Sequence, residues 1–298
     1  MYLRLFLNGL AWVLCAPLLV RAADITVIDD RGKAITLSAP AQRIVTLAPS
    51  IAELVYGAGA GERLVGVARF SDFPPAVLTL PKVGDAARVD LEQVFALKPD
   101  LIIGWKTGNQ SADIERLEQF GFKVFVIEPA TLSAIPRVLR TMGRLAGNNA
   151  TAEIAAVGFE RGIAALAERY GRRLIVRVFY EIWHEPLMTV NGRHMINDVI
   201  RLCGGSNVFA GVPGLTPVVS LESVIAAQPE VVLGGSSAIS PEEFAALWRG
   251  YRNFVKLRNV NAMFVDPDQI QRQTPRILQG AQTVCEHLEK VRSARNVR

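Results

Sequence analysis

The sequence contains few of the residues that hold metal ions. Three histidines (His184, His194 and His287) and three cysteines occur among 298 residues. Their spacing matches none of the His, Cys and Asp patterns that bind zinc or similar ions. We therefore expect no resident metal ion and no cofactor.

Motifs of catalysis are also missing. The segment Gly57–Glu62 (GAGAGE) contains glycines like those of a dinucleotide loop, but it follows a helical pattern rather than a strand. The segment Gly234–Ala238 (GGSSA) lacks the last glycine of a nucleophile elbow. No Walker loop occurs. These absences predict a protein that is not an enzyme.

Runs of basic residues are absent too. The chain has 33 Lys and Arg against 28 Asp and Glu, and the basic residues are scattered. A nucleic-acid-binding surface gathers its basic residues on one face or along one element. We therefore expect no nucleic-acid partner.

Only one long apolar run occurs, and it lies at the N-terminus after Arg4. Its length of about 16 residues is below the roughly 20 that a membrane-spanning helix needs. With Ala22 and Ala23 behind it, the run predicts a secretory signal peptide over residues 1–22, cleaved near those alanines. Leu14 stands directly before Cys15, where a lipoprotein signal needs a small residue, so we do not expect lipidation.

Two cysteines, Cys203 and Cys285, remain after that cleavage. An exported protein folds in an oxidising compartment, where free thiols are disfavoured. The count favours one disulfide over two separate buried thiols.

The rest of the chain alternates between strand-like and helix-like segments, which predicts an α/β fold with mainly parallel sheets. At the start of the first helix, Ser50 with Glu53 three residues later forms the pattern of a capping box. The predicted strands are Arg43–Ala48, Arg63–Ala68, Asp100–Trp105, Lys123–Pro129, Arg172–Ile182, Glu230–Gly235 and Ala262–Asp266.

A helical stretch without Gly/Ser-rich linker composition separates two such alternating regions. Its second helix, with Asn149 as the expected cap and Gly171 at its end, spans about 30 Å. We expect two α/β lobes held by a long rigid helix. The expected parts are an N-terminal lobe over 23–135, a linking helical segment over 136–171 and a C-terminal lobe over 172–298.

One pattern occurs twice, as Leu91–Trp105 (LEQVFALKPDLIIGW) and Leu221–Gly235 (LESVIAAQPEVVLGG). Glu92 and Glu222 fall in the first turn of each predicted helix, where the helix dipole alone favours an acid. Trp105 follows the apolar run of its strand, and ligands of parallel sheets bind beyond the carboxyl ends of strands. We therefore expect Trp105 to contact a ligand, with packing in the core as the alternative.

Four segments carry a resemblance to a known family. Together they resemble the periplasmic binding proteins of iron-siderophore and vitamin B12 importers, and the members that bind vitamin B12 are the nearest. The resemblance implies a class III periplasmic binding protein fold and a periplasmic location. The segments are RIVTLAPSIAELVYGAGAGERLVGVARFSDFPP, VDLEQVFALKPDLIIGW, VIRLCGGSNVF and QTPRILQGAQTVCEHL.

The resemblance implies that cobalamin or a related corrinoid is held in the cleft between the lobes. By position, Phe70 and Trp105 match aromatic residues of that cleft, and Asp268 and Arg272 match a polar pair that reaches the corrin side chains. Aromatic rings suit the broad apolar faces of a corrin, and its amides need donors and acceptors. The alternative for the polar pair is an exposed ion pair of little energetic value.

The sequence also departs from the pattern of the family. Two further aromatic cleft positions are Ala86 and Thr216 here, and a third falls near Met188. Trp183 could replace a missing ring, or it could pack in the core. These departures leave a ferric siderophore or haem as an alternative ligand. His184 and His194 lie in the stretch expected on the side of the cleft, which is a further reason to retain haem as an alternative.

The resemblance further implies a partner. Glu92 and Glu222, one in each lobe, would dock on arginines of the permease dimer of an ABC importer, which works with its ATPase. A two-lobed surface suits a partner with two-fold symmetry. The resemblance also implies a disulfide between Cys203 and Cys285. We expect a monomer.

Overall fold

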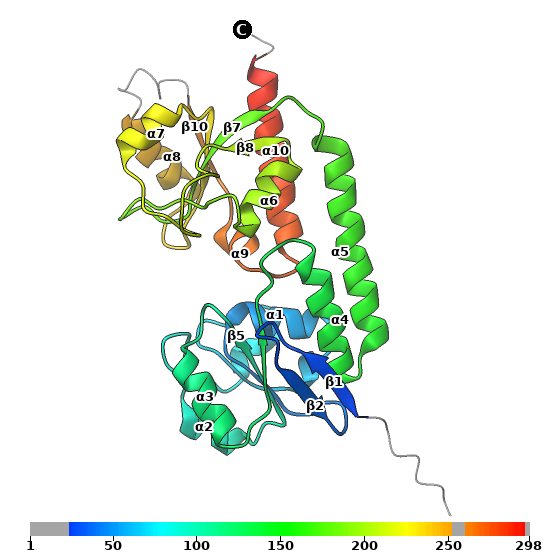
Figure 1. Cartoon of the computed structure of the whole chain (residues 1–298). Coiled ribbons are helices and arrows are strands. Elements are labelled where there is room, and N and C mark those ends of the chain that lie inside the picture. Colours follow the sequence, from blue (N-terminus) through cyan, green and yellow to red (C-terminus); the bar gives the residue numbers. More distant parts are fainter. Residues whose placement is uncertain (1–23, 252–259, 296–298) are drawn as a thin grey trace, which may run out of the picture.

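Two four-stranded parallel sheets organise the chain, one in each of two lobes (Figure 1). The computed structural model describes residues 24–251 and 260–295. The N-terminal sheet, in the order β4-β3-β5-β6, contains β3 (Ile44–Thr46), β4 (Leu64–Val67), β5 (Leu101–Trp105) and β6 (Val124–Ile127). The C-terminal sheet, in the order β10-β9-β7-β8, contains β7 (Val176–Glu181), β8 (Gly205–Asn207), β9 (Val231–Gly234) and β10 (Asn261–Phe264).

The two sheets share one topology. In each, the second strand in chain order lies on one side of the first strand and the third lies on the other. The strands are apolar runs, such as VFVI in β6, which is buried throughout because helices cover both faces of a parallel sheet. The predicted α/β fold with two mainly parallel lobes is confirmed. A hairpin of β1 (Ile25–Ile28) and β2 (Ala34–Leu37) precedes the first strand of the N-terminal sheet.

The repeated pattern forms the same structure twice. Helices α2 (Leu91–Leu97) and α7 (Leu221–Ala227) each begin at a side chain that accepts the N–H of the third helical residue. Each ends in a left-handed residue, Lys98 with φ 46° and Gln228 with φ 48°. The likeness in sequence therefore reflects two equivalent helices in two equivalent lobes.

A second acid of each repeat, Asp100 or Glu230, follows the proline after the helix and binds the backbone of a neighbouring segment. Asp100 accepts the backbone N–H of Arg43 at 3.0 Å, and Glu230 accepts that of Arg177 at 2.8 Å. The guanidinium groups of Arg43 and Arg177 donate in turn to the last carbonyls of α2 and α7, those of Leu97 and Ala227. The arginines thus satisfy carbonyls that a helix end leaves unpaired, and the acids hold the backbone of the two arginines in place.

One long helix, α5 (Asn149–Tyr170), connects the lobes (Figure 1). Its 22 residues span about 33 Å. It begins at Asn149, and the capping position is Asn148, so the expectation that Asn149 is the cap is wrong by one residue. The preceding helix α4 (Ala134–Ala146) packs on the N-terminal lobe, so α5 alone in the predicted linking segment runs along both lobes.

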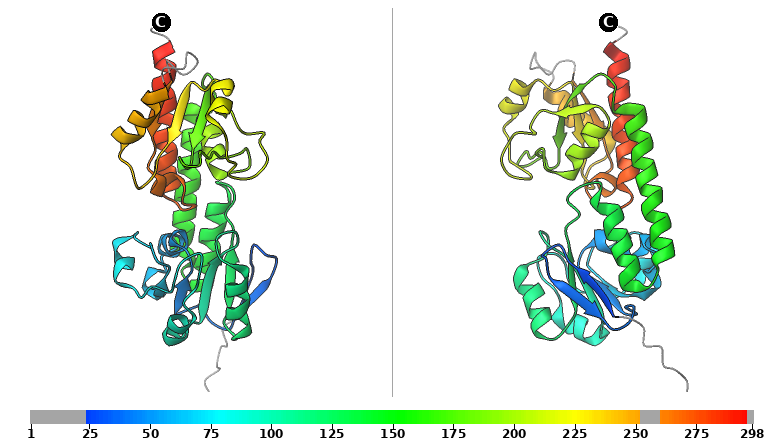
Figure 2. Two further views of the ribbon diagram at one scale, coloured as in Figure 1. Left: turned by 90° about the vertical axis from the view of Figure 1, so that its left-hand side faces the viewer. Right: turned by 45° about the vertical axis from the view of Figure 1, so that its right-hand side comes forward.

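Helix α10 (Ile277–Arg295) fixes α5 to the C-terminal lobe. The two helices lie side by side in both views of Figure 2. Leu278 of α10 packs where α5 has Gly162, and a Cβ added there would lie 2.4 Å from the leucine side chain.

Within the described residues, no helix combines the length and the apolarity required to cross a membrane. The predicted signal peptide over 1–22 lies outside those residues.

The predicted capping box at Ser50 is wrong. Helix α1 (Pro49–Gly57) begins with Pro49 in its first turn, and its capping residue Ala48 has no side chain that can accept a hydrogen bond. Glu53 is only 4% exposed and points at the other lobe. Its Oε1 accepts from Arg272 at 2.9 Å and from Arg276 at 3.3 Å. Pairing with two guanidinium groups outweighs a bond to the start of its own helix.

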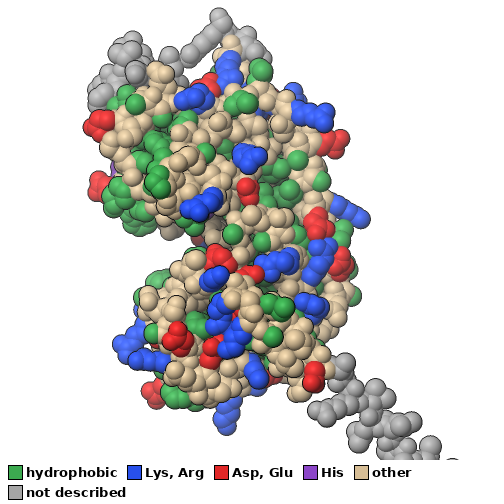
Figure 3. Space-filling model, in the orientation of Figure 1, with side chains coloured by type: hydrophobic (Ala, Val, Ile, Leu, Met, Phe, Trp, Pro, Cys, Tyr) green, Lys and Arg blue, Asp and Glu red, His purple; other side chains and the backbone are tan. Residues whose placement is uncertain are grey.

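Further contacts join the lobes beside Glu53. Asp72 forms two bonds to the guanidinium of Arg272, at 2.6 and 3.1 Å. The guanidinium of Arg276 lies 4.2 Å from the centre of the Phe73 ring, within the range of a cation–π interaction. We call Glu53, Asp72, Phe73, Arg272 and Arg276 the inter-lobe cluster. It joins the two lobes, and Figure 3 shows a hollow between them.

A disulfide between Cys203 and Cys285 is present, as predicted. Cys203 directly follows α6 (Met195–Leu202), and Cys285 lies in α10. Both residues are buried. The bond therefore fixes α10, which packs on α5, to a helix of the C-terminal lobe.

Replacing both cysteines by alanine should lower the free energy of unfolding by about 4 kcal/mol, because the bond closes a loop with a sequence separation of 82. Urea unfolding with and without a reducing agent measures this effect. The reductant should destabilise the wild type and leave the Cys203→Ala/Cys285→Ala variant unchanged. Equal sensitivity of both proteins to the reductant would refute the bond.

Replacing Glu53 by alanine should lower the free energy of unfolding by about 3 kcal/mol, because two largely buried arginines lose a shared partner. The same urea experiment measures this change. Glu153→Ala is the matched control, since it also removes a carboxylate from an arginine, but on the exposed surface. We expect it to unfold close to wild type. Equal stability of the two variants would contradict a role for the inter-lobe cluster.

Candidate ligand-binding site

The carboxyl edges of the two sheets face each other across the hollow. Helix α1 follows β3 and carries Glu53, while α9 (Pro267–Ile270) follows β10 and leads to Arg272. Because these two residues are in contact, both edges must point toward the lobe boundary. In each sheet the order of the strands reverses between the first and third strands in chain order. Ligands of α/β proteins bind at such switch points.

Trp105 ends β5 at the switch point of the N-terminal lobe and is partly exposed. Its indole Nε1 donates to Glu128 at 3.4 Å, and the ring packs against the main core. The backbone of Gly108 lies against the ring, because a Cβ there would come within 1.8 Å of an indole carbon. Trp105 thus packs against the core and is also partly exposed. Its contacts with Glu128 and Gly108 fix the orientation of the ring.

Two polar residues that the sequence did not single out hold this loop. Asn109 accepts the backbone N–H of Trp105 at 2.7 Å and donates to the Leu47 carbonyl at 2.9 Å. Glu128 accepts from the backbone N–H and the hydroxyl of Thr107 at 3.0 and 2.8 Å. The polar loop after a buried strand, which contains Asn109, was the available signal, but Leu47 and Glu128 lie 62 and 21 residues from their partners.

Phe70 lies two residues before Asp72 of the inter-lobe cluster. It is 71% exposed and has φ 66°, a left-handed conformation that is uncommon for an aromatic residue. Its ring is therefore available at the lobe boundary. Ala86, at a departure from the family pattern, lies exposed on the same lobe and supplies no ring.

The C-terminal lobe offers a second exposed ring. Trp183 is 56% exposed, and its Nε1 donates to the carbonyl of Glu185 at 2.8 Å. Met188 accepts the N–H of Ile182 at 3.0 Å and donates to the Trp183 carbonyl at 2.8 Å, which closes a turn after β7. Met188 is partly buried and pairs with Val218. Trp183 is thus not a core residue, so the packing alternative for it is excluded.

A buried carboxylate lies next to this turn. Glu181, the last residue of β7, accepts Trp248 Nε1 at 2.6 Å and bonds His184 Nδ1 at 3.1 Å. Burial raises the pKa of Glu181, and the two ring N–H groups oppose that rise. His184 and Trp183 line a pocket of about 250 Å³ at the ends of β7 and β9. The sequence did not predict this carboxylate.

The predicted polar pair is part of the contact between the lobes. Arg272 bonds Asp268 at 2.9 Å, but it also bonds Glu53 and Asp72 of the N-terminal lobe. Its side chain is only 17% exposed, so it is not the exposed i, i+4 pair of the alternative interpretation. The Arg272 guanidinium lowers the pKa of Asp72, against a smaller opposing effect of burial. Asp268 is the more exposed partner.

The other two histidines have structural roles. Burial lowers the pKa of His194 to about 4, and its Nδ1 accepts the Ile196 N–H at the start of α6. His287 bonds the carbonyl of Phe264 at 2.9 Å, and burial lowers its pKa. In residues 24–251 and 260–295, no group of three or more His, Cys, Asp and Glu could hold a metal ion.

The two predicted docking residues, Glu92 and Glu222, lie away from the inter-lobe cluster. Figure 1 places their helices, α2 and α7, at opposite ends of the molecule, on the side away from α5. Both carboxylates are exposed, and neither forms a salt bridge within the described parts of the chain. The backbone N–H of Glu222 itself and the Ser220 hydroxyl lower the pKa of Glu222.

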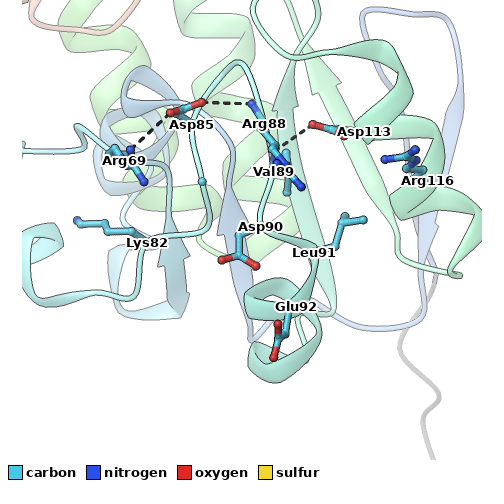
Figure 4. A pocket seen from close by; sticks show the side chains of 11 residues that line it. Arg69, Lys82, Asp85, Arg88, Val89, Asp90, Leu91, Glu92, Asp113 and Arg116 are labelled. Atoms are coloured by element: carbon cyan, nitrogen blue, oxygen red, sulfur yellow. Dashed lines mark hydrogen bonds and ion pairs between the residues drawn. The ribbon is translucent and has the colours of Figure 1, made fainter.

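Glu92 borders a shallow pocket of about 600 Å³ (Figure 4). Its lining mixes charges of both signs: Asp85 lies 4.0 Å from Arg69, and Arg88 also borders the space. None of the cations that line this pocket forms a salt bridge with Glu92 in the described part of the chain. The carboxylate remains available to a partner.

Known proteins with similar sequences share this architecture. The family model for periplasmic binding proteins matches residues 44–249. The vitamin B12-binding protein of Vibrio parahaemolyticus serotype O3:K6 is 35% identical over 256 residues, which cover 86% of this chain and 92% of that protein. The vitamin B12-binding protein of Yersinia pestis strain Pestoides F is 31% identical over 92% of this chain and 94% of its own length.

Solved structures agree with these sequence matches. The crystal structure of the periplasmic vitamin B12-binding protein of Vibrio cholerae superposes with a TM-score of 0.76 at 33% identity, over 85% of this chain and 98% of that one. A periplasmic heme-binding protein of Roseiflexus sp. RS-1 has a TM-score of 0.68 at 25% identity, over 82% and 97%. The chain therefore belongs to the family of periplasmic binding proteins.

Proposed function

We propose that this protein binds cobalamin or a related corrinoid in the hollow between its lobes and delivers it to an ABC importer of the inner membrane. In this proposal, residues 1–22 are removed during export, and the mature protein acts in the periplasm as a monomer. Its role is transport rather than catalysis. The ligand and the permease with its ATPase are its partners.

The observation that carries the proposal is the pair of exposed rings beside the lobe boundary. Phe70 of the N-terminal lobe and Trp183 of the C-terminal lobe remain exposed where most large apolar side chains are buried. Trp105 adds a partly exposed ring beyond the carboxyl end of β5. Flat apolar side chains from two lobes suit the two faces of a corrin, and the similar proteins named above are vitamin B12-binding proteins.

Polar groups near the rings suit the rim of the same ligand. Asp268 keeps part of its carboxylate open to solvent, and Arg272 stands beside it. The amide side chains of a corrin need both acceptors and donors. A ligand amide bound here would share Arg272 with Asp72 and Glu53, so binding would add to the contact between the lobes.

Haem or a ferric siderophore is the second candidate ligand. The likeness to a heme-binding protein of 25% identity favours haem in particular. Two positions that are aromatic in the family pattern are Ala86 and Thr216 here, so fewer rings would be available to cover a corrin. Titration with each ligand class separates the two candidates.

Isothermal calorimetry with cyanocobalamin should give a one-to-one complex with a dissociation constant of about 1 μM or lower. Trp183→Ala should weaken it roughly tenfold, because an exposed ring loses its contact with the corrin. Phe120→Ala is the control: this ring is also exposed, but it lies beyond α3 (Ser111–Gln119) and packs against Phe95 of α2. No heat with cyanocobalamin, together with clear binding of haemin or a ferric siderophore, would overturn the corrinoid assignment.

Charge reversal at Glu92 and Glu222 should abolish uptake of the ligand into vesicles that contain the cognate importer, because each lobe loses its acid for the permease. The affinity for cyanocobalamin should stay unchanged, since neither residue belongs to the inter-lobe cluster. Glu242→Lys is the matched control, because Glu242 is also an exposed acid in the first turn of a helix, α8 (Pro241–Gly250). Loss of affinity in the double variant, or normal uptake by it, would contradict the docking role.

A further inference from the structure

His184 differs from the other two histidines of the chain. One ring nitrogen of His194 and one of His287 bond to backbone groups, and burial lowers the pKa of both rings. His184 keeps 27% of its side chain exposed and lines the pocket at the ends of β7 and β9. That pocket lies at the switch point of the C-terminal sheet, where α/β proteins bind ligands.

Buried side chains fix the orientation of this imidazole. The Glu181 carboxylate accepts Nδ1–H of His184 at 3.1 Å, and Trp248 Nε1–H holds the other carboxylate oxygen at 2.6 Å. With Nδ1 as the donor, the lone pair of the ring lies on Nε2. No described residue bonds that nitrogen.

A carboxylate that holds one imidazole nitrogen is the usual support for a histidine whose other nitrogen binds a metal, because it fixes the tautomer and raises the basicity of the ring. Here the carboxylate is almost fully buried, while the imidazole opens into a pocket. One Glu181 oxygen serves the fold by accepting the buried Trp248 Nε1–H, whereas the other oxygen bonds only His184 among the described residues.

The neighbouring side chain suits a flat ligand around that metal. Trp183 precedes His184 directly, and its ring is exposed beside the same pocket. A flat macrocycle lying on the indole would bring its central metal toward the imidazole. Isolated metal ions need further ligands, and none are clustered here among the described residues, so the metal must arrive inside its ligand.

We propose that His184 Nε2 binds the cobalt of the transported corrinoid at an exchangeable axial position, held in place by Glu181. This inference rests on the proposed function and refines it. The preferred cargo is a corrinoid with a water molecule at one axial position, rather than one with both axial positions blocked.

The chemistry is a ligand exchange without oxidation or reduction. The Nε2 lone pair forms a bond to Co(III), and the bound water leaves with its own electron pair. The Nδ1 proton stays in the bond to Glu181. Cobalt keeps six ligands throughout.

Titration with two corrinoids tests the inference. Diaquacobinamide carries exchangeable water on both faces, and cyanocobalamin carries cyanide on one face and its own base on the other. Wild-type protein should shift the visible absorption bands of diaquacobinamide to longer wavelength, as free imidazole does. His184→Ala should bind diaquacobinamide at least about tenfold more weakly and without the shift. In this variant cyanocobalamin should lose less affinity than diaquacobinamide, because both of its axial positions are blocked.

Glu242→Gln is the control variant, because Glu242 is an exposed acid of the same lobe that does not line the pocket of His184, and it should behave as wild type in every titration. Retained binding of cyanocobalamin by His184→Ala also shows that this variant is folded. An unchanged shift in His184→Ala, or binding of diaquacobinamide to wild type without any shift, overturns the inference and leaves the transport of corrinoids intact. Failure of the wild type to bind either corrinoid overturns the proposed function itself.

Discussion

The buried contact between Glu53 and Arg272 joins the two lobes of the protein. Burial raises the pKa of Glu53, and the two guanidinium groups of the cluster oppose that rise. A carboxylate in this position is costly unless it stays paired, so separating the lobes would leave charges without partners in a poorly solvated place. The contact acts together with α5, which is packed against α10 and is thereby tied to the disulfide. Two rigid connections, one ionic and one helical, set the width of the hollow.

The distance between the two halves of the candidate site depends on the width of the hollow. Phe70 and Trp105 belong to one lobe, and Trp183 and His184 belong to the other, so their separation is set by the inter-lobe cluster rather than by local structure. The same constraint governs the surface proposed for docking. Glu92 and Glu222 lie on equivalent helices of equivalent lobes, and a partner with two-fold symmetry can engage both only if their spacing is constant. The fold thus links the ligand site and the docking surface through one relation between lobes.

The sequence predicted the parts of this protein that depend on local pattern or on family likeness. The alternation of strands and helices, the repeated helix and the disulfide between Cys203 and Cys285 follow from such signals. Glu53 was assigned to a capping box because its partners in the structure lie more than 200 residues away. The support of His184 by Glu181 was missed for a different reason. The two residues lie three apart at the end of a strand, where no sequence pattern indicates a contact, and Trp248 completes the arrangement from α8. Tertiary partners decide the role of a charged residue, and one sequence alone does not reveal them.

The distance between the lobes in solution shows whether they are fixed before the ligand binds. Nitroxide labels at Ala96 of α2 and Ala226 of α7, equivalent exposed positions of the repeat, report this distance by double electron–electron resonance. A preset hollow predicts one narrow distribution in the free protein, with a mean that moves by less than about 2 Å when cyanocobalamin saturates it. A broad distribution that narrows only when the ligand binds would contradict the claim that Glu53, Arg272 and α5 fix the lobes in advance.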